Sequence, residues 1–139
     1  MIIHSEQDMI SFGEQIAEGL VLPATIELVG DIGVGKTTLA KGIAKGLGIV
    51  DEVTSPSFTI SKIYRSKSKS QPTILTHFDF YRLDEPGILQ EELGESIQNP
   101  DTVTIIEWGS TVKNILPKHR IEISISQNDD GSRIVKVKS

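Results

Sequence analysis

The chain has 139 residues, a formal net charge of −5 and no cysteine. This length predicts one compact domain, residues 1–139, that folds without covalent cross-links. The lack of cysteine excludes disulfides, thiolate zinc sites and a thiol nucleophile, and the acidic charge argues against direct binding of a nucleic-acid backbone.

The first segment predicts a helix rather than a targeting signal. Residues 1–11 carry two acids and no basic n-region, so a secretory signal is not expected. No apolar run approaches the roughly 20 residues that span a bilayer, and we expect a cytoplasmic protein without membrane contact. Ser5-Glu6-Gln7-Asp8 resembles a capping box. The apolar residues after it recur at helical spacing, which predicts a helix to about Leu20.

A strand, a glycine-rich loop and a second helix are expected next. Residues 25–29, which follow Pro23, predict a short strand. After the loop, apolar residues at helical spacing predict a helix from Lys36 to about Leu47, which Gly48 closes.

The middle of the chain alternates polar loops and short elements. Residues 53–63 predict a loop and then a strand, and the polar stretch 65–72 predicts a further loop. Its basic part, residues 65–70, is either a contact for an acidic partner or a solvated loop. A strand over 74–78 and a short helix over 88–97 follow.

The last third predicts a buried strand and a hairpin. Residues 103–106 are almost wholly apolar, which suits a strand covered on both faces. Residues 120–126 and 133–138 alternate in period two around Asn128-Asp129-Asp130-Gly131, which predicts a hairpin. The order of elements implies a single-domain α/β fold, with a mainly parallel sheet flanked by helices and a C-terminal antiparallel hairpin.

Residues 30–37, G-D-I-G-V-G-K-T, match the phosphate-binding pattern G-x-x-x-x-G-K-[ST]. The glycines let successive N–H groups point inward and form a nest for an anion, and the following helix adds its positive end. The Lys36 ammonium can reach the β- and γ-phosphates, and the Thr37 hydroxyl can join a Mg²⁺ shell. The predicted nucleotide-binding residues are Gly30, Asp31, Gly33, Val34, Gly35, Lys36, Thr37 and Thr38. The alternatives are a tight turn that binds nothing and, for Thr38, a plain residue of the first helical turn.

Two acids stand where expected strands end. A phosphate site that works with Mg²⁺ needs a carboxylate, and in open α/β sheets ligands gather at the carboxyl ends of the strands. We hypothesise that Glu107 and Thr37 hold Mg²⁺ and that Asp79 orients the attacking water. Lys36, Asp79 and Glu107 are the predicted catalytic residues. Both acids could instead be solvated strand ends.

Four neighbouring side chains remain open to more than one interpretation. His77 lies on the same strand face as Asp79, and could bind phosphate, bind an acid or be structural. Trp108, the only tryptophan, could stack at the site, face a partner or pack in the core. Tyr81 could place a ring near the phosphates. Arg82 could act as an arginine finger in cis, unless a partner supplies one, or form a surface ion pair.

Four stretches together resemble the TsaE (YjeE) family over nearly the whole chain. They are G-D-I-G-V-G-K-T-T at 30–38, V-T-S-P-S-F at 53–58, H-F-D-F-Y-R-L at 77–83 and I-E-W at 106–108. The family comprises small bacterial P-loop ATPases required for the threonylcarbamoyladenosine modification of tRNA. The resemblance implies the cofactors ATP and Mg²⁺, rather than GTP.

The resemblance also implies roles and partners. It assigns the Mg²⁺ acid to Glu107 and a second essential acid to Asp79, and it suggests a switch-like loop at 54–58. It implies a TsaD–TsaB partner pair that transfers the threonylcarbamoyl group, with tRNA reached only through that pair and hydrolysis resetting it. Ser57 and Ser110 depart from the usual family residues, which puts a charge contact at Ser110 in doubt.

The expected function is therefore a P-loop ATPase that is slow in isolation. The runner-up is a small-metabolite or nucleoside kinase, which would transfer phosphate to a small hydroxyl compound without a partner. A GTPase is disfavoured because no N-K-x-D tetrapeptide is present to recognise guanine. A nucleotide-sensing adaptor would bind ATP and hydrolyse none.

Overall fold

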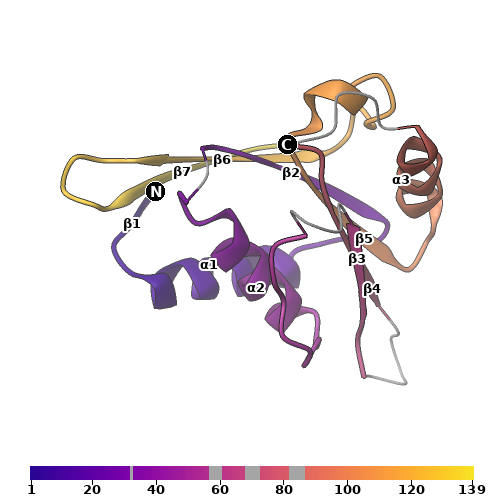
Figure 1. The fold of residues 1–139 in the computed structure, drawn as a ribbon. Helices are drawn as coiled ribbons and strands as arrows, with labels where there is room; N and C mark the ends of the chain where they lie inside the picture. Colours follow the sequence, from indigo (N-terminus) through magenta and orange to yellow (C-terminus); the bar gives the residue numbers. More distant parts are fainter. Residues whose placement is uncertain (32, 57–60, 68–72, 82–86) are drawn as a thin grey trace.

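The structure is a computed structural model that describes residues 1–31, 33–56, 61–67, 73–81 and 87–139. Within these residues the chain forms one mixed sheet with helices on both faces (Figure 1). The strands are β1 Ile2–Ile3, β2 Ala24–Val29, β3 Ser61–Arg65, β4 Ile74–Asp79, β5 Thr102–Glu107, β6 Ile121–Gln127 and β7 Arg133–Lys138. The helices are α1 Glu6–Glu18, α2 Lys36–Gly46, α3 Ile88–Gln98 and the 3-10 helix η1 Gly109–Val112.

The sheet has a parallel centre and antiparallel edges. Its order is β1-β7-β6-β2-β5-β4-β3, and the strands from β6 to β4 run parallel to one another. Strand β7 pairs antiparallel with β6 and β1, and β3 pairs antiparallel with β4. The predicted α/β fold with its terminal hairpin is confirmed. Sequence reasoning missed β1, because two residues show no periodicity, and the antiparallel direction of β3.

Two apolar layers enclose the central strands. Helices α1 and α2 pack on one face of the sheet, and α3 with η1 covers the other. Alternate residues of β5 serve the two layers, since Val103 and Ile105 belong to the first cluster and Ile106 to the second. This two-sided burial explains the apolar sequence of the strand. In the described part of the chain, no helix is long and apolar enough to cross a membrane.

Most predicted boundaries are within two residues of the observed ones. The Ser5 hydroxyl accepts a hydrogen bond from the Asp8 N–H, as a capping residue should. Helix α1 ends at Glu18 rather than Leu20, and α2 ends at Gly46. The two acids are the last residues of their strands, because β4 reaches Asp79 and β5 reaches Glu107.

Helices α1 and α2 cross at glycines. A Cβ atom built on Gly13 would lie 2.7 Å from the Ile43 backbone nitrogen, and one on Gly46 would lie 2.6 Å from the Ala17 Cβ. A Cβ atom on Gly42 would overlap the Ile10 backbone. The two backbones are therefore in direct contact, which holds α2 firmly against its neighbour.

Replacing Gly42 by Ala is expected to destabilise the fold by about 2 kcal/mol, because the overlap exceeds the gain in helix propensity. The control is Gly94→Ala in α3, where a Cβ atom meets nothing within 4 Å. That variant should be stabilised by about 0.5–1 kcal/mol. Urea unfolding measures both changes, and equal stabilisation by the two substitutions would contradict the close crossing.

Candidate functional site

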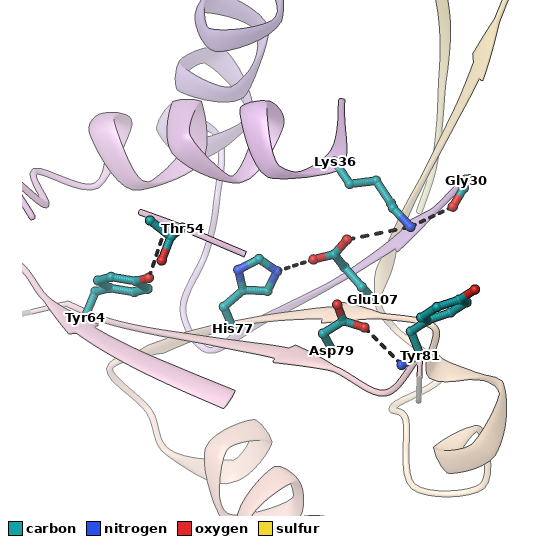
Figure 2. Close-up of polar contacts among 8 residues, drawn as sticks. All are labelled: Gly30, Lys36, Thr54, Tyr64, His77, Asp79, Tyr81 and Glu107. Carbon is teal, nitrogen blue, oxygen red and sulfur yellow. Dashed lines mark hydrogen bonds and ion pairs between the residues drawn. The ribbon is translucent and has the colours of Figure 1, made fainter. Parts of the chain in front are cut away.

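The carboxyl ends of three parallel strands bring the predicted residues together. Strand β2 leads into the glycine-rich loop, residues 30–35, and β5 lies between β2 and β4. In the strand register, Glu107 pairs with Leu28 on one side and with Asp79 on the other. The two acids therefore end neighbouring strands beside the loop (Figure 2).

The N-terminus of α2 lacks the capping side chain and the first-turn acids that usually pair with the free N–H groups of a helix. Its N-cap, Gly35, has φ +113° and offers no side-chain hydrogen bond, and the first turn contains no acid. Helix α1, by contrast, is capped by Ser5 and carries Glu6 and Asp8 in its first turn. The first N–H groups of α2 and the positive end of its dipole are therefore left for another acceptor, which suits an anion.

The loop itself depends on glycine where it passes the hairpin. A Cβ atom on Gly30, whose φ is +154°, would lie 2.9 Å from a Val34 methyl and against the Ile125 carbonyl oxygen. Thr37 and Thr38 occupy the first turn of α2 and are half-buried. Asp31 is exposed. The loop is thus closely packed at Gly30, and two hydroxyl residues follow it in α2.

The Lys36 side chain is buried and turned back onto the loop. It is 6 % exposed, and its ammonium donates to the Gly30 carbonyl at 2.6 Å. The same nitrogen lies 3.7 Å from Glu107 Oε1 and 4.3 Å from the centre of the Trp108 ring. A buried charge is costly unless it is paired, and these three contacts supply the pairing. Figure 2 shows the contacts with Gly30 and Glu107.

Both predicted acids are buried, so the alternative of solvated strand ends is wrong. Asp79 is 6 % exposed and Glu107 is 3 % exposed. Asp79 Oδ1 accepts the Tyr81 N–H at 3.0 Å. The His77 ring lies 2.7 Å from Glu107 Oε2 through Nε2, so of the roles left open for this residue the contact with an acid is confirmed.

Trp108 both packs in the core and borders the site. It is half-buried against the α3 layer, and its ring lies 4.7 Å from that of Tyr81. Its φ of +57° makes it, in the described ranges, the one non-glycine residue in the left-handed region. Such strain at a bulky residue is uncommon and concentrates at functional sites. Arg82 lies outside the described residues, so its role as an arginine finger stays a prediction.

Nucleotide binding is expected to change the fluorescence of Trp108, because phosphate would draw the Lys36 ammonium away from the ring. No other tryptophan contributes to the emission. A titration with ATP should show a change that saturates at the concentration found by calorimetry. A flat signal at saturating ATP would show that the Lys36 ammonium does not leave the ring when nucleotide binds.

A cavity of about 340 Å³ adjoins the loop, and sequence reasoning missed it. Its walls come from the loop, the N-terminal segment and the hairpin. The lining residues are Ile3, His4, Ser5, Glu6, Met9, Gly33, Val34, Gly35, Thr38, Gly131 and Arg133. The loop therefore opens onto a space large enough for part of a small ligand.

Arg133, at the start of β7, ties the hairpin to the loop. Its Nε donates to the Val34 carbonyl at 2.9 Å, and a terminal nitrogen donates to the Gly131 carbonyl at 2.6 Å. The preceding turn is ordered by Asp130, which accepts both the N–H and the hydroxyl of Ser132. These hydrogen bonds lower the pKa of Asp130 below its ordinary value. The hairpin thus supports the loop from the side of the cavity.

The donor set fits a metal ion that arrives with a nucleotide. Among the described residues, no group of three or more histidines and acids could hold a metal by itself. Thr37 and Glu107 offer a hydroxyl and a carboxylate beside the loop. Mg²⁺ prefers oxygen ligands and is usually held by one or two protein groups together with phosphates and water.

The predicted switch-like loop is only partly described. The Thr54 N–H donates to the Tyr64 hydroxyl at 3.3 Å, and the Lys62 ammonium donates to the Thr54 hydroxyl. These contacts anchor the start of the stretch to β3. Residues 57 and 58 lie outside the described part of the chain, so its role as a switch stays a prediction.

Comparison with known proteins places the chain in a family. Residues 3–135 match the family described as threonylcarbamoyl adenosine biosynthesis protein TsaE. The TsaE protein of Haemophilus influenzae is 35 % identical over 95 % of this chain and 84 % of its own length. That of Treponema pallidum is 32 % identical over 98 % of this chain and 97 % of its own length.

The crystal structure of Bacillus subtilis YdiB is similar with a TM-score of 0.79 and 30 % identity, over 97 % of this chain and 80 % of that one. The chain belongs to the TsaE family of tRNA threonylcarbamoyladenosine biosynthesis proteins.

Proposed function

We propose that this protein is a Mg²⁺-dependent ATPase that supports a TsaD–TsaB pair in the threonylcarbamoyl modification of tRNA. One observation carries the proposal: the uncapped start of α2 lies beside the buried Lys36, whose ammonium is 3.7 Å from the buried Glu107. A helix N-terminus and a buried ammonium attract phosphate. A neighbouring carboxylate suits the Mg²⁺ ion that accompanies the phosphates.

The loop binds the phosphates in this proposal. The first N–H groups of α2 donate to phosphate oxygens, and Lys36 exchanges the Gly30 carbonyl for the β- and γ-phosphates. The 340 Å³ cavity beside Thr38 and Arg133 accepts the rest of the nucleotide. The buried ammonium thus remains paired whether or not nucleotide is bound, which lowers the cost of keeping it in the site.

The two acids have different roles, one in binding the cation and the other in orienting water. Thr37 and Glu107 hold Mg²⁺, which when bound neutralises charge on the phosphates. Asp79 ends the strand next to Glu107 and orients the attacking water. Its Oδ1 accepts the Tyr81 N–H, which fixes the carboxylate at the edge of the site. A water so placed attacks the γ-phosphorus in line with the leaving oxygen.

The isolated chain should turn over slowly. Of the three described arginines, Arg133 is bound to loop carbonyls and Arg120 is paired with Glu27. Arg65 lies opposite Ile74, at the end of β4 away from Asp79, so none of the three is ready to stabilise a transition state. An arginine finger is worth about 10³ to 10⁵ in rate. A partner, or Arg82, would have to supply it. Hydrolysis then resets the partner pair.

The test measures ATP hydrolysis by the chain alone, with TsaD–TsaB, and with tRNA added. Stimulation by the protein pair is the expected result. Phosphate transfer to a small hydroxyl compound without the pair would favour a kinase instead. ATP binding with no hydrolysis under any of these conditions would favour a nucleotide-sensing adaptor.

Replacing Arg133 by Ala is expected to weaken ATP binding about 10-fold, because the Val34 carbonyl loses its donor and the loop loses its support. Lys136→Ala, on the same strand and exposed, is the control and should leave the dissociation constant unchanged. Calorimetry measures both. Equal affinities for the two variants would show that the hairpin does not shape the loop.

A further inference from the structure

The His77 ring is buried, and one of its two nitrogens lacks a hydrogen-bond partner within the described residues. Its ring is fully buried, with 0 % exposure, and Nε2 lies 2.7 Å from Glu107 Oε2. Its Nδ1 is the one buried side-chain polar atom without a hydrogen-bond partner among the residues that the structure describes. Buried polar atoms are nearly always paired, and an apolar side chain would fill the same space without that cost. Packing alone therefore does not account for a histidine here.

The contact with Glu107 assigns the ring proton. A carboxylate only accepts hydrogen bonds, so Nε2 carries the hydrogen and donates it to Oε2. The other oxygen, Oε1, is the one that faces the Lys36 ammonium at 3.7 Å. His77 therefore divides the carboxylate into an oxygen bound by the protein and an oxygen turned toward the loop (Figure 2).

The ring keeps this role when nucleotide binds. The Glu107 carboxylate is held by His77 at Oε2 and by Lys36 at Oε1. If Lys36 turns to phosphate, as the proposed function requires, the Nε2–H of His77 is the contact that remains. A carboxylate held at one oxygen cannot rotate freely, and its second oxygen stays directed at the loop.

We propose that His77 is a positioning residue for Glu107. It holds Oε2 so that Oε1 faces the phosphate-binding loop in the orientation that a divalent cation needs. The proposal rests on the proposed function, because it assumes that Glu107 binds the cation. It adds a residue that acts through the acid and touches neither the nucleotide nor the cation.

A matched pair of amides separates positioning from packing. In His77→Gln the amide nitrogen reaches roughly the place of Nε2 and can donate to Glu107. In His77→Asn it lies near the place of Nδ1 and cannot reach. His77→Met fills the space without any donor, and replaces the Asn variant if that variant does not fold.

The main measurement is the affinity of Mn²⁺ for the ADP-loaded chain, which electron paramagnetic resonance determines. Loss of an outer partner of a metal ligand typically costs about 10 to 100-fold in metal affinity. We expect that loss in the Asn and Met variants, and an affinity within about 3-fold of wild type in the Gln variant, which keeps the donor. ADP binding measured in EDTA should be the same in all of them, and thermal unfolding reports on the fold.

Two results would overturn the proposal. One is wild-type Mn²⁺ affinity in the Asn or Met variant. The other is an equal loss in the Gln and Asn variants, which would make the ring a packing residue. Failure of the nucleotide site on which the proposed function depends has a different signature, since the wild-type chain itself would then bind neither ADP nor Mn²⁺. Failure of the hydrolysis step alone would appear only in the turnover assay and would leave these affinities unchanged.

Discussion

Replacing Glu107 by Gln is expected to lower the rate of Mg²⁺-dependent ATP hydrolysis by about 10³-fold, or about 4 kcal/mol in the activation free energy. The amide keeps the shape of the side chain, and its oxygen can still accept the hydrogen bond from His77. What it loses is the negative charge that anchors the cation. ATP binding in EDTA should be almost unaffected, because the loop and Lys36 are intact.

The control is Glu122→Gln, which removes the same charge from strand β6 of the same sheet. Its turnover should equal that of wild type. Initial rates of phosphate release, measured across a Mg²⁺ titration with the stimulating partners present, compare the two variants. Wild-type turnover in the Glu107 variant would remove this acid from the chemistry.

Replacing Lys36 by Met is expected to weaken ATP binding about 100-fold, or about 2.7 kcal/mol, because hydrogen bonds to charged groups are the strong ones. Methionine keeps much of the buried stem and removes the ammonium. The fold should persist, since the lost partners are the Gly30 carbonyl, the Trp108 ring and a carboxylate that His77 also binds. Calorimetry gives the dissociation constant, and thermal unfolding checks the fold.

Lys45→Met is the matched control at the opposite end of α2. Lys45 is exposed and pairs with Glu14 at 3.2 Å, which is a surface ion pair of small energetic value. ATP affinity should not change in this variant. Equal affinities in the two methionine variants would mean that the phosphates lie elsewhere.

The strand, glycine-rich loop and helix around residues 30–37 were predictable because their signal is local. Residues 30–37 stand together in sequence, and the strand before them and the helix after them show clear apolar patterns. The acids could be proposed from their positions at strand ends. Their adjacency could not, because the pairing of Asp79 with Glu107 depends on the register of two strands that are far apart in the chain.

Contacts over long sequence separations account for what sequence reasoning missed. Arg133 reaches the Val34 carbonyl across 99 residues, and no local pattern distinguishes it from the other basic residues of the alternating hairpin. The cavity has the same origin, since the N-terminal segment and the hairpin meet only when β1 pairs with β7. The contact between His77 and Glu107 depends on the register of β4 and β5, so the sequence leaves it as one of several interpretations.

The left-handed backbone at Trp108 sets a trade-off for any effort to evolve this protein in the laboratory. That conformation favours glycine or asparagine, so a smaller residue there would relieve backbone strain on the order of 1 kcal/mol. The same substitution would lose the packing of the indole against the α3 layer and its contact with Lys36, and truncation of a packed aromatic side chain typically costs more than about 1 kcal/mol. Selection for heat resistance should therefore keep the indole unless other substitutions fill its place, and a lineage that replaces it would show whether ATP turnover needs the ring.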